Sequence, residues 1–141
     1  MANRIKVDLR IPPEGVMLHD YELEPLQGDL YRVVDIPSPF DDDWFEFQDT
    51  LRLRRAEDGV LEVAEVVERG RWKRFEFVIS EQFAKSDEFN AFVARVVSAQ
   101  GVWVLDFGGC LSVFLPPSSI WNPEPELEAA NTACARRLRQ T

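Results

Sequence analysis

The sequence predicts an α+β fold: a twisted antiparallel sheet or partial barrel of about six N-terminal strands, one packed helix, a C-terminal hairpin and a terminal helix. Apolar and polar residues alternate through most of residues 1–80, which is typical of half-buried strands. In residues 81–141 the pattern changes to a helix, a second alternating segment and a helical tail. With 141 residues, 45% of them hydrophobic, we expect a single domain spanning residues 1–141.

The mostly β part is predicted to consist of short strands joined by turns. Residues 4–11 alternate strictly, and a Pro-Pro pair ends that strand because proline cannot donate a ladder hydrogen bond. Residues 16–26 and 30–36 flank Gln27-Gly28-Asp29, a spacer typical of a hairpin. Further strands are expected in three segments, at residues 45–55, 60–68 and 71–79. The second of these also fits helical spacing, but its four valines favour a strand.

The C-terminal part carries the helix signals. Ser86-Asp87-Glu88 is typical of a helix start, and apolar residues at helical spacing follow it. We expect Gly101 to end that helix with a positive φ. Gly108-Gly109 predicts a two-residue hairpin turn. The segment from Pro123 has acidic residues in its first turn and basic residues in its last, which matches the dipole of a terminal helix. A narrow apolar stripe is expected to dock this helix: Leu127, Ala130, Cys134 and Leu138.

The negative charge is concentrated in one segment. Residues 14–49 contain eleven acidic residues and one basic residue, so this segment has a net charge of −10. The rest of the chain has a net charge of +1, which gives the formal total of −9. Such a field repels phosphate backbones and attracts basic surfaces. The charge therefore disfavours nucleic acid and favours a basic protein partner.

Several chemistries lack the residues that they need. Counting from Asp41, the acidic run has no glycine at the sixth position of a calcium loop, and a solvated turn is its simpler interpretation. His19 is the only histidine, so neither a zinc site nor a histidine-based nucleophile has support. No phosphate-loop, dinucleotide or HExxH motif occurs. We expect no metal, cofactor or catalytic residue, although the abundance of acids leaves a carboxylate pair open.

Two smaller features have structural interpretations. Basic residues surround Trp72 and Phe75 in residues 68–77, a pattern that can hold single-stranded nucleic acid, but the acidic balance favours an ordinary strand. Cys110 and Cys134 lie in apolar or small-residue runs, where buried free thiols are expected. No segment is apolar enough for a signal peptide or a membrane span, which predicts a cytoplasmic protein.

The hairpin sequence and the strand after it resemble a group of small bacterial proteins, the domain of unknown function 4265 family. The matching residues are Glu22 to Leu26, Tyr31 to Pro37, Phe40 and Asp58 to Val67. The resemblance implies a bacterial, cytoplasmic α+β protein and no catalytic activity.

Function is predicted from the segment PSPFDDDWFEF, residues 37–47. An acidic run next to large aromatics suits a non-catalytic binding module of the inhibitor or immunity type, because charge steers encounter and a buried aromatic supplies affinity. The predicted partner-binding residues are Asp41, Asp42, Asp43, Trp44 and Glu46. The alternative is a small-molecule-binding protein or enzyme with a pocket between the sheet and the helix at 87–100. Its lining would be aromatic: Trp72, Trp103, Phe107 and Trp121.

Overall fold

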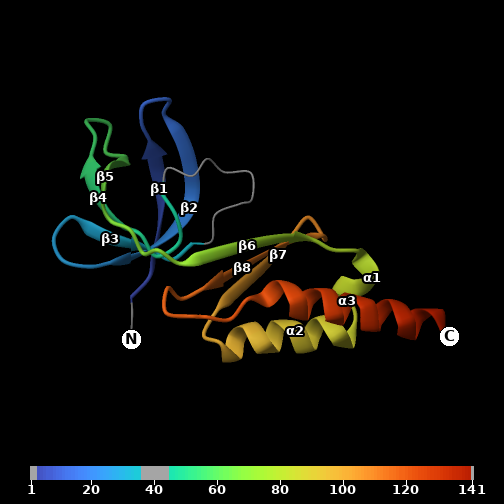
Figure 1. The fold of residues 1–141 in the computed structure, drawn as a ribbon. Coiled ribbons are helices and arrows are strands. Elements are labelled where there is room, and N and C mark those ends of the chain that lie inside the picture. Colours follow the sequence, from blue (N-terminus) through green and yellow to red (C-terminus); the bar gives the residue numbers. More distant parts are fainter. Residues whose placement is uncertain (1–2, 36–44, 141) are drawn as a thin grey trace. The chain divides into compact units, whose positions relative to one another are not determined.

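The computed structural model describes residues 3–35 and 45–140 and shows an α+β fold with a C-terminal helix (Figure 1), as predicted. The chain forms two compact units, Met1–Arg71 and Trp72–Thr141, called unit 1 and unit 2 below. The prediction that the first six strands belong together is wrong, because the sixth belongs to the sheet of unit 2. The expectation of a single domain stays a prediction.

Unit 1 is a five-stranded closed barrel. Its strands are β1 (Ile5–Ile11), β2 (Val16–Pro25), β3 (Leu30–Val33), β4 (Thr50–Arg55) and β5 (Leu61–Glu68). Consecutive strands pair antiparallel, and β5 closes on β1 in parallel through Leu9↔Leu61 and Arg10↔Glu62. The parallel closure follows from the strand number, since the first and last of five alternating strands run in the same direction.

The barrel core consists of the side chains that alternate inward. Leu9, Leu23, Val33 and Leu51 are fully buried there, and other apolar residues pack around them. The register between β1 and β2 shifts between Val7 and Leu9, where two residues of β2 oppose one of β1. Such a bulge increases strand twist and helps a small sheet to close.

Unit 2 is a three-stranded antiparallel sheet with three helices. Its elements are β6 (Lys73–Val78), α1 (Glu81–Ala84), α2 (Asp87–Ser98), β7 (Val102–Asp106), β8 (Cys110–Leu115) and α3 (Pro123–Arg139). The strand order is β6-β8-β7, and α2 and α3 lie side by side along the sheet (Figure 1). The one-turn helix α1, which was not predicted, is capped by Ser80, whose side chain accepts a hydrogen bond from the Phe83 N–H.

The helix start and the hairpin of unit 2 follow the predicted positions closely, with two corrections. Ser86 caps α2 as expected. The left-handed residue after α2 is Gln100 (φ 62°), not Gly101. Gly101 is required for space instead, since a Cβ there would lie 2.7 Å from Leu115 Cδ2 and 2.8 Å from the Phe114 carbonyl oxygen. The β7–β8 loop has three residues, Phe107 (φ 56°), Gly108 (φ 74°) and Gly109, instead of the predicted two, because Asp106 pairs with Cys110.

The core of unit 2 lies between the sheet and the helices α2 and α3. Phe89, Phe92 and Val96 of α2 pack with three buried leucine and valine side chains of β8. Leu127 and the free thiol of Cys134 are buried on α3, as the apolar stripe predicts, but Leu138 at its end is 40% exposed. Cys110, also expected to be buried, is half-buried. Among the described residues, no helix combines the length and the apolar character needed to span a membrane.

Candidate functional site

The predicted partner-binding segment is only partly described. Asp41, Asp42, Asp43 and Trp44 lie outside the described residues, whereas Glu46 is half-buried in the loop before β4. The Glu46 N–H donates to Asp49 Oδ2 at 2.8 Å, and the Glu46 carbonyl oxygen accepts from the Asp49 N–H at 3.0 Å. Asp49 therefore fixes the backbone of the segment's C-terminal end.

Asp49 is a buried carboxylate that the sequence analysis counted only as one of the acids. Its side chain is 1% exposed, and besides Glu46 it accepts hydrogen bonds from the Gly70 N–H at 2.8 Å and from Arg69 Nη1 at 2.9 Å. Gly70 must be glycine for this approach, because a Cβ would lie 2.4 Å from the Gln48 carbonyl oxygen. This carboxylate ties the loop before β4 to the segment after β5, which is a structural role.

The surplus of negative charge belongs to unit 1. Its sequence holds seventeen acidic and nine basic residues, a net charge of −8, whereas unit 2 holds eight acidic and seven basic residues, a net charge of −1. Six cations of unit 1 already pair with carboxylates of the same unit: Arg4, Arg10, Arg32, Arg52, Arg54 and Arg69. Four exposed acids of unit 1 have no ion pair with a described residue: Glu14, Asp20, Glu57 and Glu68.

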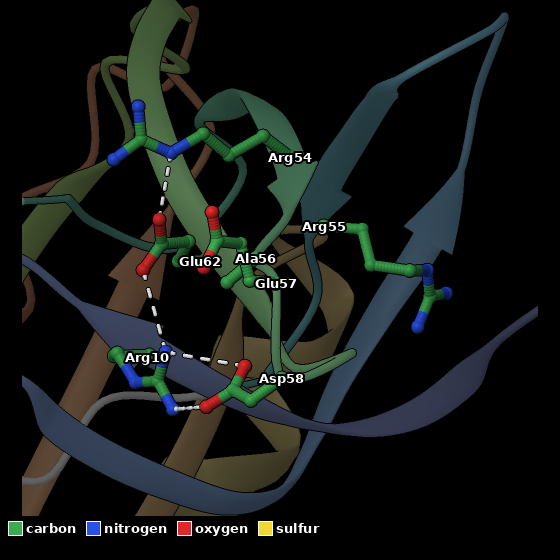
Figure 2. Close-up of a pocket in the computed structure, with 7 residues that line it drawn as sticks. All are labelled: Arg10, Arg54, Arg55, Ala56, Glu57, Asp58 and Glu62. Atoms are coloured by element: carbon green, nitrogen blue, oxygen red, sulfur yellow. Dashed lines mark hydrogen bonds and ion pairs between the residues drawn. The ribbon is translucent and has the colours of Figure 1, made fainter.

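An open depression of about 570 Å³ lies on the outside of the barrel (Figure 2). It is lined by Arg10, Arg54, Arg55, Ala56, Glu57, Asp58 and Glu62. Arg54 Nε donates to Glu62 at 2.7 Å, and Arg10 lies between Glu62, at 3.6 Å, and Asp58, at 2.5 Å. The hydrogen bond from Arg10 lowers the pKa of the Asp58 carboxyl and raises the pKa of the guanidinium.

The charges of this depression compensate one another. Glu62 is 14% exposed and sits between two arginines, while Arg55 donates to the Gly59 carbonyl oxygen at 2.6 Å. An incoming anion would have to displace carboxylates that already hold the guanidinium groups. The network therefore links β1, β4 and β5 rather than forming an anion site. This network was not predictable from the sequence, because Arg10 and Glu62 become neighbours only when β5 closes on β1.

Among the aromatic residues predicted to line a pocket between the sheet and the helix, Trp72 is half-buried directly before β6. Trp103 and Trp121 pack on the core beside α2, and Phe107 is 79% exposed at the hairpin tip. Trp121 also stacks under Arg95, 4.4 Å from guanidinium carbon to ring centre, and donates to Glu126. Trp103 and Trp121 therefore contribute to the core of unit 2, whereas Phe107 lies at its surface, and the pocket itself stays a prediction.

The remaining candidate groups have local partners. His19 Nδ1 lies 3.4 Å from Asp8 Oδ1 at the β1–β2 bulge, with both side chains largely exposed. In the basic and aromatic stretch, Arg69 holds Asp49 and Lys73 donates to the Ser119 carbonyl oxygen. No three His, Cys, Asp or Glu side chains of residues 3–35 and 45–140 are arranged to hold a metal ion.

A solved structure shares the fold of this chain. It is a crystal structure of a hypothetical protein from Neisseria gonorrhoeae, similar with a TM-score of 0.57 over 92% of this chain and 89% of that protein. The two sequences are 16% identical, so the likeness concerns the fold alone. No family model matches the chain, and no curated protein matches it.

Proposed function

We propose that this protein is a non-catalytic binding module of the inhibitor or immunity type, whose acidic unit docks on a basic protein partner. The observation that carries the proposal is the charge of unit 1, −8, set against −1 for unit 2. Most arginines of unit 1 are already paired, so the surplus carboxylates are what an approaching protein meets. A cytoplasmic location and membership of the domain of unknown function 4265 family are parts of the same proposal.

Steering towards a partner and affinity for it have different physical sources. Like charges add over a surface and accelerate the encounter with a basic partner, whereas desolvated aromatic anchors slow dissociation. In this proposal Asp41, Asp42 and Asp43 supply steering, Trp44 is the anchor, and Glu46 adds charge from a backbone position that Asp49 fixes.

The proposal is tested with a variant that removes three charges and keeps side-chain size, Asp41→Asn with Asp42→Asn and Asp43→Asn. Wild-type and variant protein are immobilised, basic proteins captured from a bacterial lysate are identified, and the association of each is then measured with purified material. We expect the on-rate to fall several-fold in the variant and with rising salt, while the off-rate changes less.

A matched control removes three charges elsewhere in unit 1, at exposed acids that form no ion pair with a described residue: Glu14→Gln, Asp20→Asn and Glu57→Gln. This control should reduce the on-rate less than the first triple variant does, because distant charges are screened more strongly. Equal binding by wild type and by the first variant at low salt would contradict the proposal. So would a set of captured proteins without basic surfaces.

A further inference from the structure

The strand β7 is an edge of the unit 2 sheet. It pairs with β8 in an uninterrupted register, from Val102↔Phe114 to Asp106↔Cys110, and with no other described strand. All five of its residues are half-buried, so the strand is partly accessible. Its outer edge therefore presents backbone N–H and C=O groups that another strand can pair with.

Edge strands are normally protected against such pairing by lysine, proline, bulges or inward charges. β7 reads VWVLD and carries a single charge, Asp106, at its end. The contrast with β5 lies within the same chain. From Val63 onward, β5 pairs with β4 alone, so this part of β5 is also an edge. It is protected by register shifts at Ala64 and Val67 and by two further glutamates. β7 has none of these protections.

Exposed apolar side chains mark both ends of β7. Phe107, directly after the strand, is 79% exposed, and it holds a left-handed φ of 56° that suits asparagine or glycine better. Val97, in the last turn of α2, is 60% exposed. That turn lies at the start of β7, because the Cβ position of Gly101 is 3.0 Å from Val96 Cγ1.

We propose that β7 pairs antiparallel with β7 of a second copy of this chain, about a twofold axis at Val104. In this register Trp103 faces Leu105 of the second copy, Val104 faces Val104, and Asp106 faces Val102. The pairs Trp103–Leu105 and Val104–Val104 place large apolar side chains opposite each other, which stabilises antiparallel strands, and no two carboxylates oppose each other. The result is a continuous six-stranded sheet, three strands from each copy.

The same register explains the two exposed apolar residues. Phe107 of each copy falls opposite Gly101 of the other, beside the end of α2 where Val97 is exposed. One surface thus complements itself, as a twofold interface requires. The charge distribution permits this contact, since unit 2 carries only −1 and two copies meet there with little repulsion. A basic partner, by contrast, has little electrostatic attraction to this edge.

The pairing is tested by light scattering after gel filtration over a range of protein concentrations. Wild type should approach twice the chain mass of 16.2 kDa as concentration rises. Val104→Lys should stay at the mass of one chain, because it places two ammonium groups opposite each other at the twofold axis. Val78→Lys is the matched control: it adds the same charge at an 89% exposed residue of β6, and should dimerise like wild type.

Two further variants keep the test decisive if Val104→Lys folds poorly. Phe107→Asn introduces a residue type that suits the left-handed turn, and its dimer should dissociate more readily because the interface loses an aromatic side chain. An equimolar mixture of Val104→Lys and Val104→Glu should recover the dimer through opposite charges. A wild type that remains monomeric throughout would overturn the proposal. So would a dimer that survives both Val104→Lys and Phe107→Asn.

Discussion

Asp49 holds more backbone in place than any other carboxylate in the described part of unit 1. It accepts hydrogen bonds from the N–H groups of Glu46 and Gly70 and from Arg69. We predict that Asp49→Ala lowers the free energy of unfolding by about 1–3 kcal/mol, because two backbone donors lose their acceptor in a largely desolvated place. Urea denaturation measures the change. Glu68→Gln, at an exposed acid of the same unit, should have little effect, and equal effects of the two variants would contradict this role.

The residues that sequence analysis placed correctly are those with local signals. Ser86 caps α2 because its hydroxyl needs only the N–H group three residues later, and that spacing is visible in the sequence. The role of Asp49 was invisible, since its partners Arg69 and Gly70 come about twenty residues later and are brought near by the barrel. Gly101 was predicted to be glycine because of a positive φ, whereas the structure requires glycine there because Leu115 and Phe114 leave no space for a Cβ atom.

At the scale of elements, one ion pair fastens α3 to α2. Arg137 donates to both carboxylate oxygens of Glu88, at 2.7 and 3.1 Å, and this bidentate contact lowers the pKa of Glu88 from 4.5 to about 2. A carboxyl group whose pKa is lower in the folded than in the unfolded protein stabilises the fold at pH values above the unfolded-state pKa. This stabilisation is lost as the pH falls through the folded-state pKa. The stabilisation by Glu88 should therefore be complete above pH 4.5 and lost towards pH 2.

The variant Glu88→Gln tests this contact. At neutral pH it should melt at a lower temperature than wild type, and the difference should shrink as pH is lowered from about 5 to about 2. Glu128→Gln removes an exposed acid of α3 and serves as the control, with a melting temperature close to that of wild type at each pH. A wild-type advantage over Glu88→Gln that does not depend on pH would show that the ion pair is not its source.

Element positions were predictable, but the pairing of elements was not. The valines of β5 and the helical spacing of α2 correctly identified a strand and a helix. The sixth strand, β6, has the same alternating pattern as the strands of unit 1, yet it pairs with β8, which begins more than thirty residues later. Alternation specifies that a strand has a buried face and not which strand lies beside it. The candidate binding segment was proposed from composition alone, and only Glu46 of it is described.

At the scale of the whole molecule, each unit has a core of its own. Among the described residues, the buried cluster in the barrel consists of unit 1 side chains, and the cluster between the sheet and the helices consists of unit 2 side chains. Each unit therefore has the apolar interior that a folding domain requires. Their charges differ, since unit 1 carries −8 and unit 2 carries −1.

This difference gives a prediction for the two units expressed separately, as residues 1–71 and 72–141. Both fragments should unfold cooperatively, and salt should raise the melting temperature of the first more than that of the second. Raising the ionic strength from about 0.01 M to about 1 M shortens the Debye length from about 30 Å to about 3 Å. That change removes the mutual repulsion of the surplus carboxylates in the compact barrel. Salt also weakens exposed ion pairs, but these contribute little each, so relief of repulsion should dominate in unit 1.

Thermal melts followed by circular dichroism at several salt concentrations measure the effect, and the near-neutral second fragment is the internal control. Equal shifts in both fragments would show that the charge surplus does not strain the barrel, and a second fragment without a cooperative transition would show that its core is insufficient alone.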